Sequence, residues 1–318
     1  MRPSKMTLAT TLVSVAAFGV FAGACSSSSK SGSSSPTTPD VASTTAAPTT
    51  AAPTTAPPLT ITANDYAYAG GPLTVKAGIV DVKFVNQGSV SHEMTFIKVT
   101  PGTAVHALVK ALAKGGQDGP KPASIISING VHDTAAGKTT LTQFNLTPGS
   151  YIATCFDSGV AGSKKDGQPH FMRGMTKQIT VTGTGGAVLP TAETLVTAHD
   201  YGFDVSGLKA GTHTVLFKNI GPKQYHFVDL VAFPKGTTIA QGEGYVTKLL
   251  ASNGPPPAGV PQPKDVAGSE AAGPGNGNTF TATLEKGITY VALCFFNATT
   301  GGPPHAIGHH MYKVFQVS

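Results

Sequence analysis

The chain has 318 residues, which suggests about two domains, and only 12% of its residues are charged. Its 38 glycines and 24 prolines are typical of a β-rich extracellular protein with many turns. The formal net charge is +6, but no run of Lys and Arg is interleaved with aromatic residues, so we expect no nucleic-acid partner.

Residues 1–24 have the features of a secretory signal peptide. A basic start, "MRPSK", precedes "LATTLVSVAAFGVFA", which is too short and too rich in alanine for a membrane span. The segment ends in "AGAC", which resembles the bacterial lipobox, where the signal is cut before a lipid-bearing cysteine. The resemblance implies an extracytoplasmic protein lipid-anchored to the cell membrane through Cys25. The alternative is ordinary secretion with cleavage nearby, because the first lipobox position is more often Leu than Ala.

Residues 25–58 consist mainly of Ser, Thr, Pro and Ala. Such a segment buries too little apolar surface to offset the entropy of ordering. We therefore predict a disordered tether that holds the folded part away from the membrane.

Beyond residue 58 the chain repeats itself in a fixed order. "YIATCF" at 151–156 corresponds to "YVALCF" at 290–295, and "PHFMRGMTKQITV" corresponds to "PHAIGHHMYKVFQV". The period of about 135 residues is too long for a solenoid, so each copy is a domain. We predict domains at 59–182 and 194–318 with a linker at 183–193.

Each copy contains short runs that alternate apolar and polar residues and are separated by Gly, Pro or Asn. One stretch in each copy has helical apolar spacing, at 103–116 and at 237–254. The predicted fold class is all-β, with two tandem Greek-key sandwiches that each carry a short helical insert.

Four residues recur in the same order in both copies: a His after a turn, a Cys that ends an apolar strand, a His after Pro, and a Met before the last strand. They are His92, Cys155, His170 and Met175 in the first copy, and His226, Cys294, His305 and Met311 in the second. One thiolate, two imidazoles and a thioether form the donor set of a type 1 copper centre.

This order resembles the cupredoxin, or plastocyanin-like, family across nearly all of 59–318. The resemblance implies cupredoxin-like domains with one type 1 copper each. It implies that the Cys thiolate couples to copper, that the two His complete a plane, and that the Met tunes the potential from the axis. It also implies that the C-terminal His is the electron port and that a redox partner protein docks nearby.

The sequence departs from the simple family pattern in two ways. Fourteen residues separate Cys155 from His170, and ten separate Cys294 from His305, where simple cupredoxins have only a few. The second copy also reads "GHHM", so His309 or His310 are alternate ligands in place of Met311 or His305.

Other interpretations stay open at this point. Cys155 and Cys294 could form a disulfide, or could be buried thiols in a metal-free structural protein. With the same ligands, the protein could be an envelope copper buffer or chaperone instead of an electron carrier. We expect no enzyme: a nitrite reductase would need a further copper site, for which His132, His199 or His309 are the available histidines, but no motif supports one.

Several other residues carry no expected function. His106, His132, His199 and His213 are interpreted as ordinary surface or turn residues. The recurring pairs Asp65-Tyr66 and Asp200-Tyr201 are explained by a buried tyrosine and a turn aspartate. Met172 is expected to pack rather than to bind metal, because Met175 matches the repeat; alternatively it joins Phe171, Ala306 and Ile307 in an apolar collar around the C-terminal histidines.

Overall fold

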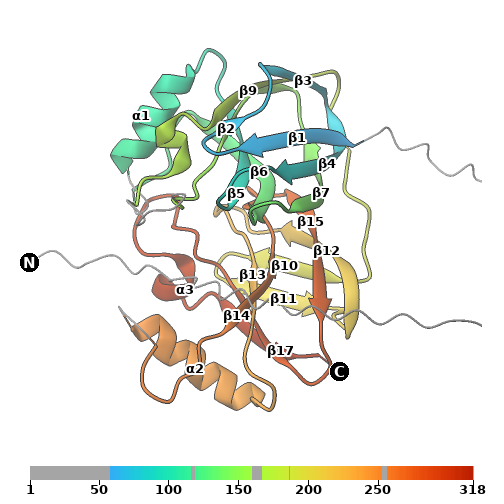
Figure 1. Cartoon of the computed structure of the whole chain (residues 1–318), viewed down its shortest axis with the longest axis vertical. Helices are drawn as coiled ribbons and strands as arrows, with labels where there is room; N and C mark the ends of the chain where they lie inside the picture. The colour runs from blue at the N-terminus through green and yellow to red at the C-terminus, as the bar shows by residue number, and fades with distance from the viewer. Residues whose placement is uncertain (1–57, 116–118, 160–166, 186, 253–255, 318) are drawn as a thin grey trace, which may run out of the picture. The chain divides into compact units, whose positions relative to one another are not determined.

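The computed structural model describes residues 58–115, 119–159, 167–185, 187–252 and 256–317 (Figure 1). The predicted signal peptide, Cys25 and the tether up to residue 57 lie outside these residues. Residues 57–318 form one compact unit by themselves. Among the described residues, no helix is long and apolar enough to cross a membrane.

The first repeat is built from two β-sheets. One sheet has the order β3-β9-β8-β5-β6, and β7-β4-β1-β2 form part of the other. Its strands are β1 (Leu59–Asn64), β2 (Ala67–Tyr68), β3 (Leu73–Lys76), β4 (Gly78–Asn86), β5 (His92–Val99), β6 (Ile125–Thr134), β7 (Thr139–Leu146), β8 (Gly149–Thr154) and β9 (Thr176–Thr182). The helix α1 (Val105–Gly115) and the 3-10 turn η1 (His170–Arg173) complete it.

The second repeat uses the same plan. One sheet has the order β14-β13-β16-β17, and β11-β10-β12-β15 form part of the other. Its strands are β10 (Leu195–His199), β11 (Gly202–Ser206), β12 (Gly211–Asn219), β13 (Asp229–Ala232), β14 (Lys264–Gly268), β15 (Gly277–Leu284), β16 (Thr289–Leu293) and β17 (Tyr312–Gln316). Its helices are α2 (Ile239–Ala251) and α3 (His305–Gly308). The predicted all-β fold of two sandwiches with helical inserts is confirmed.

Each sandwich has its own apolar core, and the predicted sulfur ligands are part of it. Cys155 and Met175 lie in a cluster with Phe84, Phe96 and other buried side chains of the first repeat. Cys294 and Met311 lie in the matching cluster of the second repeat. The sulfur atoms are therefore held by close-packed surroundings rather than by a surface loop.

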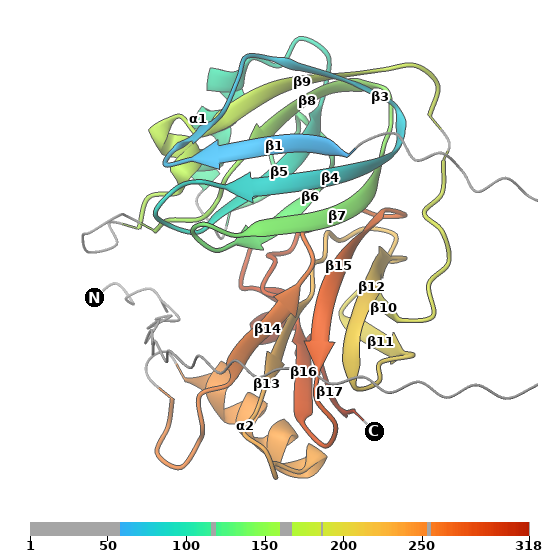
Figure 2. The same cartoon turned by 45° about the vertical axis from the view of Figure 1, so that its right-hand side comes forward.

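The two repeats share a sheet, which the sequence did not predict. Asn278 of β15 pairs with Phe144 of β7, so the two four-stranded sheets join into one of eight strands (Figure 2). Amide side chains reinforce the join: Asn129 Nδ2 donates to Gly277 O at 2.9 Å, and Asn278 Nδ2 donates to Asn129 Oδ1 at 3.0 Å. These hydrogen bonds satisfy the donor groups of both buried amides at the join.

A buried carboxyl group accepts a hydrogen bond across the same interface. Thr95 of the first repeat donates its hydroxyl to Glu270 Oε1 of the second at 3.2 Å. Glu270 is 7% exposed. Burial raises the pKa of Glu270 to about 8, and the nearby carboxylates of Asp133 and Asp229 act in the same direction.

This raised pKa predicts that the chain loses stability as the pH rises. Folded Glu270 keeps its proton up to about pH 8, whereas the unfolded residue releases it near 4.5. The folded state therefore binds more protons across this window, and the free energy of unfolding falls with rising pH. Glutamine does not ionise, so in Glu270→Gln we expect the free energy of unfolding to fall less across this window, by on the order of 1–4 kcal/mol.

The measurement is chemical denaturation between pH 5 and pH 9 for parent, Glu270→Gln and Glu243→Gln. Glu243 is exposed on α2 and serves as the control. Parallel pH profiles for the parent and Glu270→Gln would contradict the assignment.

Candidate metal centres

Strand pairing brings the first histidine and the cysteine of the first repeat together. His92 begins β5, and Cys155 directly follows β8. The two strands are antiparallel neighbours, with Thr95 paired to Thr154. This register places Cys155 beside the His92 end of β5, as sheet geometry requires.

The turn η1 brings the second histidine, His170, back beside Cys155. Phe171 N donates to Cys155 O at 2.9 Å, and Met175 N donates to His170 O at 3.0 Å. Gly174 ends the turn with φ 98°, a left-handed conformation that favours glycine. The long segment after Cys155 therefore comes back beside the cysteine; residues 160–166 of it lie outside the described part of the chain.

The three donor atoms of the first centre meet in the interior. His92 Nδ1 and His170 Nδ1 are 3.0 Å apart. Cys155 Sγ is 3.4 Å from His170 Nδ1 and 3.9 Å from His92 Nδ1. All three residues are 0% exposed.

The second repeat reproduces this arrangement. His305 Nδ1 lies 3.1 Å from His226 Nδ1, and Cys294 Sγ lies 3.7 Å from His226 Nδ1 and 3.6 Å from His305 Nδ1. His226 is held by a β-bridge to Ala272, and Cys294 directly follows β16. The sequence predictions of two His–Cys–His groups therefore correspond to two real clusters, whose donor atoms all lie within 4.8 Å of one another.

Hydrogen bonds on the outer side of the rings show that the first cluster fits a metal ion. His92 Nε2 lies 3.3 Å from a carboxylate oxygen of Asp65, and His170 Nε2 lies 2.6 Å from Gly159 O. Both partners are acceptors, so each Nε2 donates its proton outward and each Nδ1 turns a lone pair inward. The thiol of Cys155 has one proton and satisfies only one of these lone pairs. A cation between them satisfies both.

Burial sets the protonation states of the donor groups. It raises the pKa of the Cys155 thiol well above its ordinary value and that of Cys294 to about 12. It lowers the pKa of His226 and His305 to about 4. Without metal, the second cluster is therefore neutral near pH 7, and a metal ion would have to displace the proton of the Cys294 thiol.

The methionines occupy equivalent positions in the two centres. Met175 and Met311 are both 0% exposed, and Met311 N donates to His305 O at 3.1 Å, as Met175 N does to His170 O. Met172 is 44% exposed and therefore lies partly at the surface.

The histidines of "GHHM" lie outside the second cluster. His309 and His310 are both exposed, and the ring of His309 stacks on Tyr201 with centroids 3.6 Å apart. The structure thus brings Met311, rather than either alternate histidine, into the core beside Cys294.

The C-terminal histidines do not reach the surface. His170 and His305 are 0% exposed, although the resemblance implied that each is an electron port. In the first repeat, Gly159 O accepts from Nε2 of His170. Phe171 and Ala306 are also buried, so they form no exposed collar around these rings.

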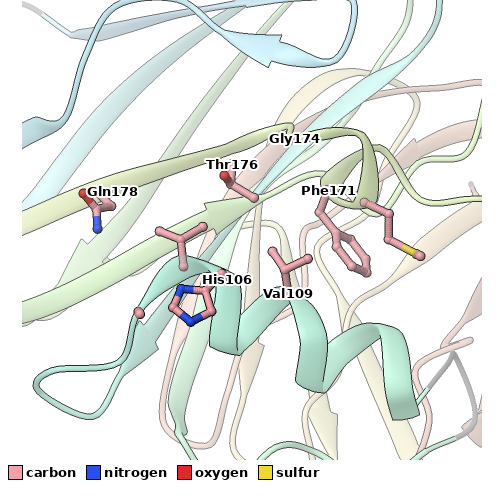
Figure 3. A pocket seen from close by; sticks show the side chains of 9 residues that line it. His106, Val109, Phe171, Gly174, Thr176 and Gln178 are labelled. Carbon is pink, nitrogen blue, oxygen red and sulfur yellow. The ribbon is translucent and has the colours of Figure 1, made fainter.

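A groove of about 530 Å³ lies beside η1, between that turn and α1 (Figure 3). His106 and Val109 of α1 line one side, and Phe171, Thr176 and Gln178 line the other.

The alternative of a Cys155–Cys294 disulfide is wrong, because both cysteines are free and each belongs to its own cluster. His132 pairs with the other repeat, because its Nε2 lies 3.5 Å from Asp229 Oδ1. His199 pairs with Asp204 at 3.6 Å on the surface.

Sequence reasoning missed two residues in each repeat. Asp65 and Asp200 face the Nε2 atoms of His92 and His226, and Tyr66 and Tyr201 contact His170 and His305. The available signal was that the Asp-Tyr pair recurs at the same place in both copies.

The lowered histidine pKa values predict acid sensitivity of the metal-free chain. Unfolded His226 and His305 take up protons near pH 6.5, whereas the folded rings resist protonation down to about 4. The free energy of unfolding therefore falls as the pH drops through this window, by at most ~3 kcal/mol per ring.

Denaturation of the metal-free parent from pH 7.5 to pH 4 measures this fall in the free energy of unfolding. His305→Gln should flatten the profile, whereas His106→Gln, at an exposed position, should not; equal slopes for His305→Gln and parent would contradict the prediction.

Comparison with known proteins gives matches among solved structures. No protein-family model and no curated protein matches the chain. An auracyanin from Roseiflexus castenholzii is 21% identical over 39% of this chain and 96% of its own, with a TM-score of 0.28. Auracyanin A, a blue copper protein from Chloroflexus aurantiacus, is 23% identical over 40% of this chain and 100% of its own, with a TM-score of 0.26.

An azurin from Methylomonas sp. strain J is 19% identical over 39% of this chain and 96% of its own, with a TM-score of 0.27. At these scores the matches carry no argument about function. The paired sheets and the grouped donor atoms are properties of this chain itself. Its two β-sandwiches, each with a buried His–Cys–His group, confirm the resemblance to cupredoxins in fold and in ligand grouping.

Proposed function

We propose that the chain is a copper protein that carries electrons through one type 1 centre in each repeat. The observation that carries the proposal is the convergence of two imidazole Nδ1 atoms and one thiol in a fully buried place, built twice. Copper bound there would supply one-electron chemistry between Cu(I) and Cu(II), and this donor set serves both states.

The residues of the chain have distinct roles in this proposal. Cys155 and Cys294 supply the thiolates, and the histidine pairs His92 with His170 and His226 with His305 complete a trigonal set. Met175 and Met311 are the axial thioethers. Because strand ends and core packing hold the donors, the geometry changes little when an electron arrives or leaves, which favours fast transfer.

Burial favours a carrier over a copper buffer or chaperone. A buffer must release its metal, and exchange needs a ligand that solvent or a partner can reach. All six His and Cys donors are 0% exposed. A metal-free structural role is disfavoured because it leaves inward lone pairs of His92 and His170 facing each other at 3.0 Å.

We place the docking site for a redox partner protein next to the first centre. Phe156, which directly follows Cys155, is 37% exposed, and Met172 is 44% exposed. The ring of Phe156 packs on Phe171 with centroids 5.1 Å apart. These side chains offer an apolar contact close to the thiolate while His170 stays covered.

The proposal also places the protein outside the cytoplasm, anchored to the cell membrane by lipid at Cys25. The signal-like residues 1–24 and the tether at 25–58 support this location. Electron transfer to a partner protein, rather than enzymatic turnover, is the activity that we assign.

Copper loading of cysteine variants tests the function. We expect two coppers per chain and an intense thiolate-to-copper absorption in the visible range, one from each His–Cys–His group. Cys155→Ser and Cys294→Ser should each lose one copper and one band, because serine offers no soft thiolate. Cys25→Ser, at the third cysteine, should leave both bands unchanged.

The measurement is a visible spectrum and a metal count after excess Cu(II) is removed, followed by release of copper to a chelator. A colourless chain that binds no copper would contradict the proposal. Rapid release of copper would instead favour a buffer or chaperone.

A further inference from the structure

Each repeat contains a strained residue at the same position. Tyr66 follows β1 with φ 63°, and Tyr201 follows β10 with φ 69°. Among the described residues, the only other non-glycine with positive φ is His310. A residue with a β-carbon rarely adopts this backbone conformation, so its recurrence indicates that the two tyrosines share a role.

The aspartate before each tyrosine faces the N-terminal histidine of the centre. Asp65 Oδ1 lies 3.3 Å from His92 Nε2, and the same carboxylate accepts from Ser89 N at 2.8 Å and from Ser89 Oγ at 2.7 Å. In the second repeat Asp200 Oδ1 lies 3.7 Å from His226 Nε2 and accepts from Gln224 N at 3.3 Å. Asp65, at hydrogen-bond distance, holds the proton on Nε2 of His92 and leaves its Nδ1 free to bind metal. Asp200 is too far from His226 Nε2 for a hydrogen bond and acts on that ring as a nearby negative charge.

The tyrosine covers the C-terminal histidine. The ring of Tyr66 meets that of His170 edge-on with centroids 5.0 Å apart, and Tyr201 meets His305 at 5.2 Å. A second group then packs on each tyrosine: Arg173 lies 5.0 Å from the ring of Tyr66, and His309 stacks on Tyr201. Each tyrosine is thus fixed between a predicted ligand and an outer side chain.

The turn opposite each aspartate has no room for a side chain. A β-carbon added at Gly88 would collide with Asp65 Oδ1 and His92 Nε2, and one added at Gly221 would collide with Asp200 Oδ1. The missing side chain therefore lets the aspartate pack against this turn in both repeats, and in the first repeat it also leaves room for His92.

We propose that Asp65-Tyr66 and Asp200-Tyr201 are the positioning pairs of the two metal centres: the aspartate fixes the ring of His92 or His226, and the tyrosine covers the ring of His170 or His305. This rests on the proposed function for its purpose, but its first consequence concerns the metal-free chain. None of these four residues binds the metal itself.

The first test needs no copper. In the metal-free chain labelled with ¹⁵N-histidine, NMR should show His92 with its proton on Nε2. Asp65→Ala should give a mixture of tautomers at His92 and leave His226 unchanged, whereas Asp65→Asn, whose amide oxygen still accepts, should restore the parent state. Asp204→Ala, which removes the partner of the surface residue His199, is the matched control. An unchanged His92 tautomer in Asp65→Ala would overturn the role of the aspartate.

The second test isolates the first centre in a Cys294→Ser background. Outer partners of metal-bound histidines typically contribute 10–100-fold to metal affinity, so Asp65→Ala should bind copper about 10–100-fold more weakly and with an altered spectrum. Unchanged affinity and spectrum in Asp65→Ala would overturn the inference and leave the copper function intact. If the Cys294→Ser chain itself binds no copper, the proposed function fails at this centre, and the tautomer test still decides the role of the aspartate.

Tyr66→Gly separates positioning from simple packing. Glycine adopts the positive φ without strain, so the variant should keep or gain thermal stability. It should nevertheless release copper to a chelator faster than the parent, because the cover over His170 is gone. Loss of stability with an unchanged release rate would show that the tyrosine only packs.

Discussion

The inward-facing Nδ1 atoms of His92 and His170 are the constraint on which the first centre depends. They lie 3.0 Å apart because each ring is tied from its outer side, one to Asp65 and one to Gly159 O. Two lone pairs at this distance in a buried place repel each other unless a positive centre lies between them. The pairing of β5 with β8, the return of the chain through η1 and the left-handed turn at Gly174 all serve to hold this arrangement.

The two centres share donor atoms but differ in their surroundings. In the first, His170 Nε2 donates to a backbone carbonyl, and Arg173 lies over Tyr66. In the second, His305 Nε2 has no hydrogen-bond partner among the described residues, and His309 stacks on Tyr201. Because outer partners tune the basicity of ligands, we expect the same donor set in these two settings to differ in metal affinity under the proposed function.

The repeats also form a joint structure rather than two independent modules. An apolar cluster contains Ile97 and Ile128 of the first repeat together with Tyr225 and Ala271 of the second. Next to it, Glu270 accepts from Thr95, and the following segment forms the bridge to His226 through Ala272. We therefore expect a substitution at this interface to shift the backbone at His226, a predicted ligand of the second centre.

The sequence by itself determined the β class, the duplication and the donor types. Alternation along short strands indicates which face is buried, and the order His, Cys, His, Met recurs in both copies with the donor types that a type 1 copper centre uses. His92, Cys155 and His170 could thus be named without coordinates, as could their counterparts. The domain limits and the role of each donor toward copper stay predictions.

Only the tertiary structure decided what surrounds these donors. Burial of His170 and His305, the exposure of Met172 and of His309, and the shared eight-stranded sheet depend on how loops fold back and how the repeats meet. These contacts join residues far apart in the chain, so no local pattern encodes them. Asp65 and Tyr66 illustrate the point. Their recurrence was visible in the sequence, but their purpose appeared only when the fold placed one against His92 and the other against His170.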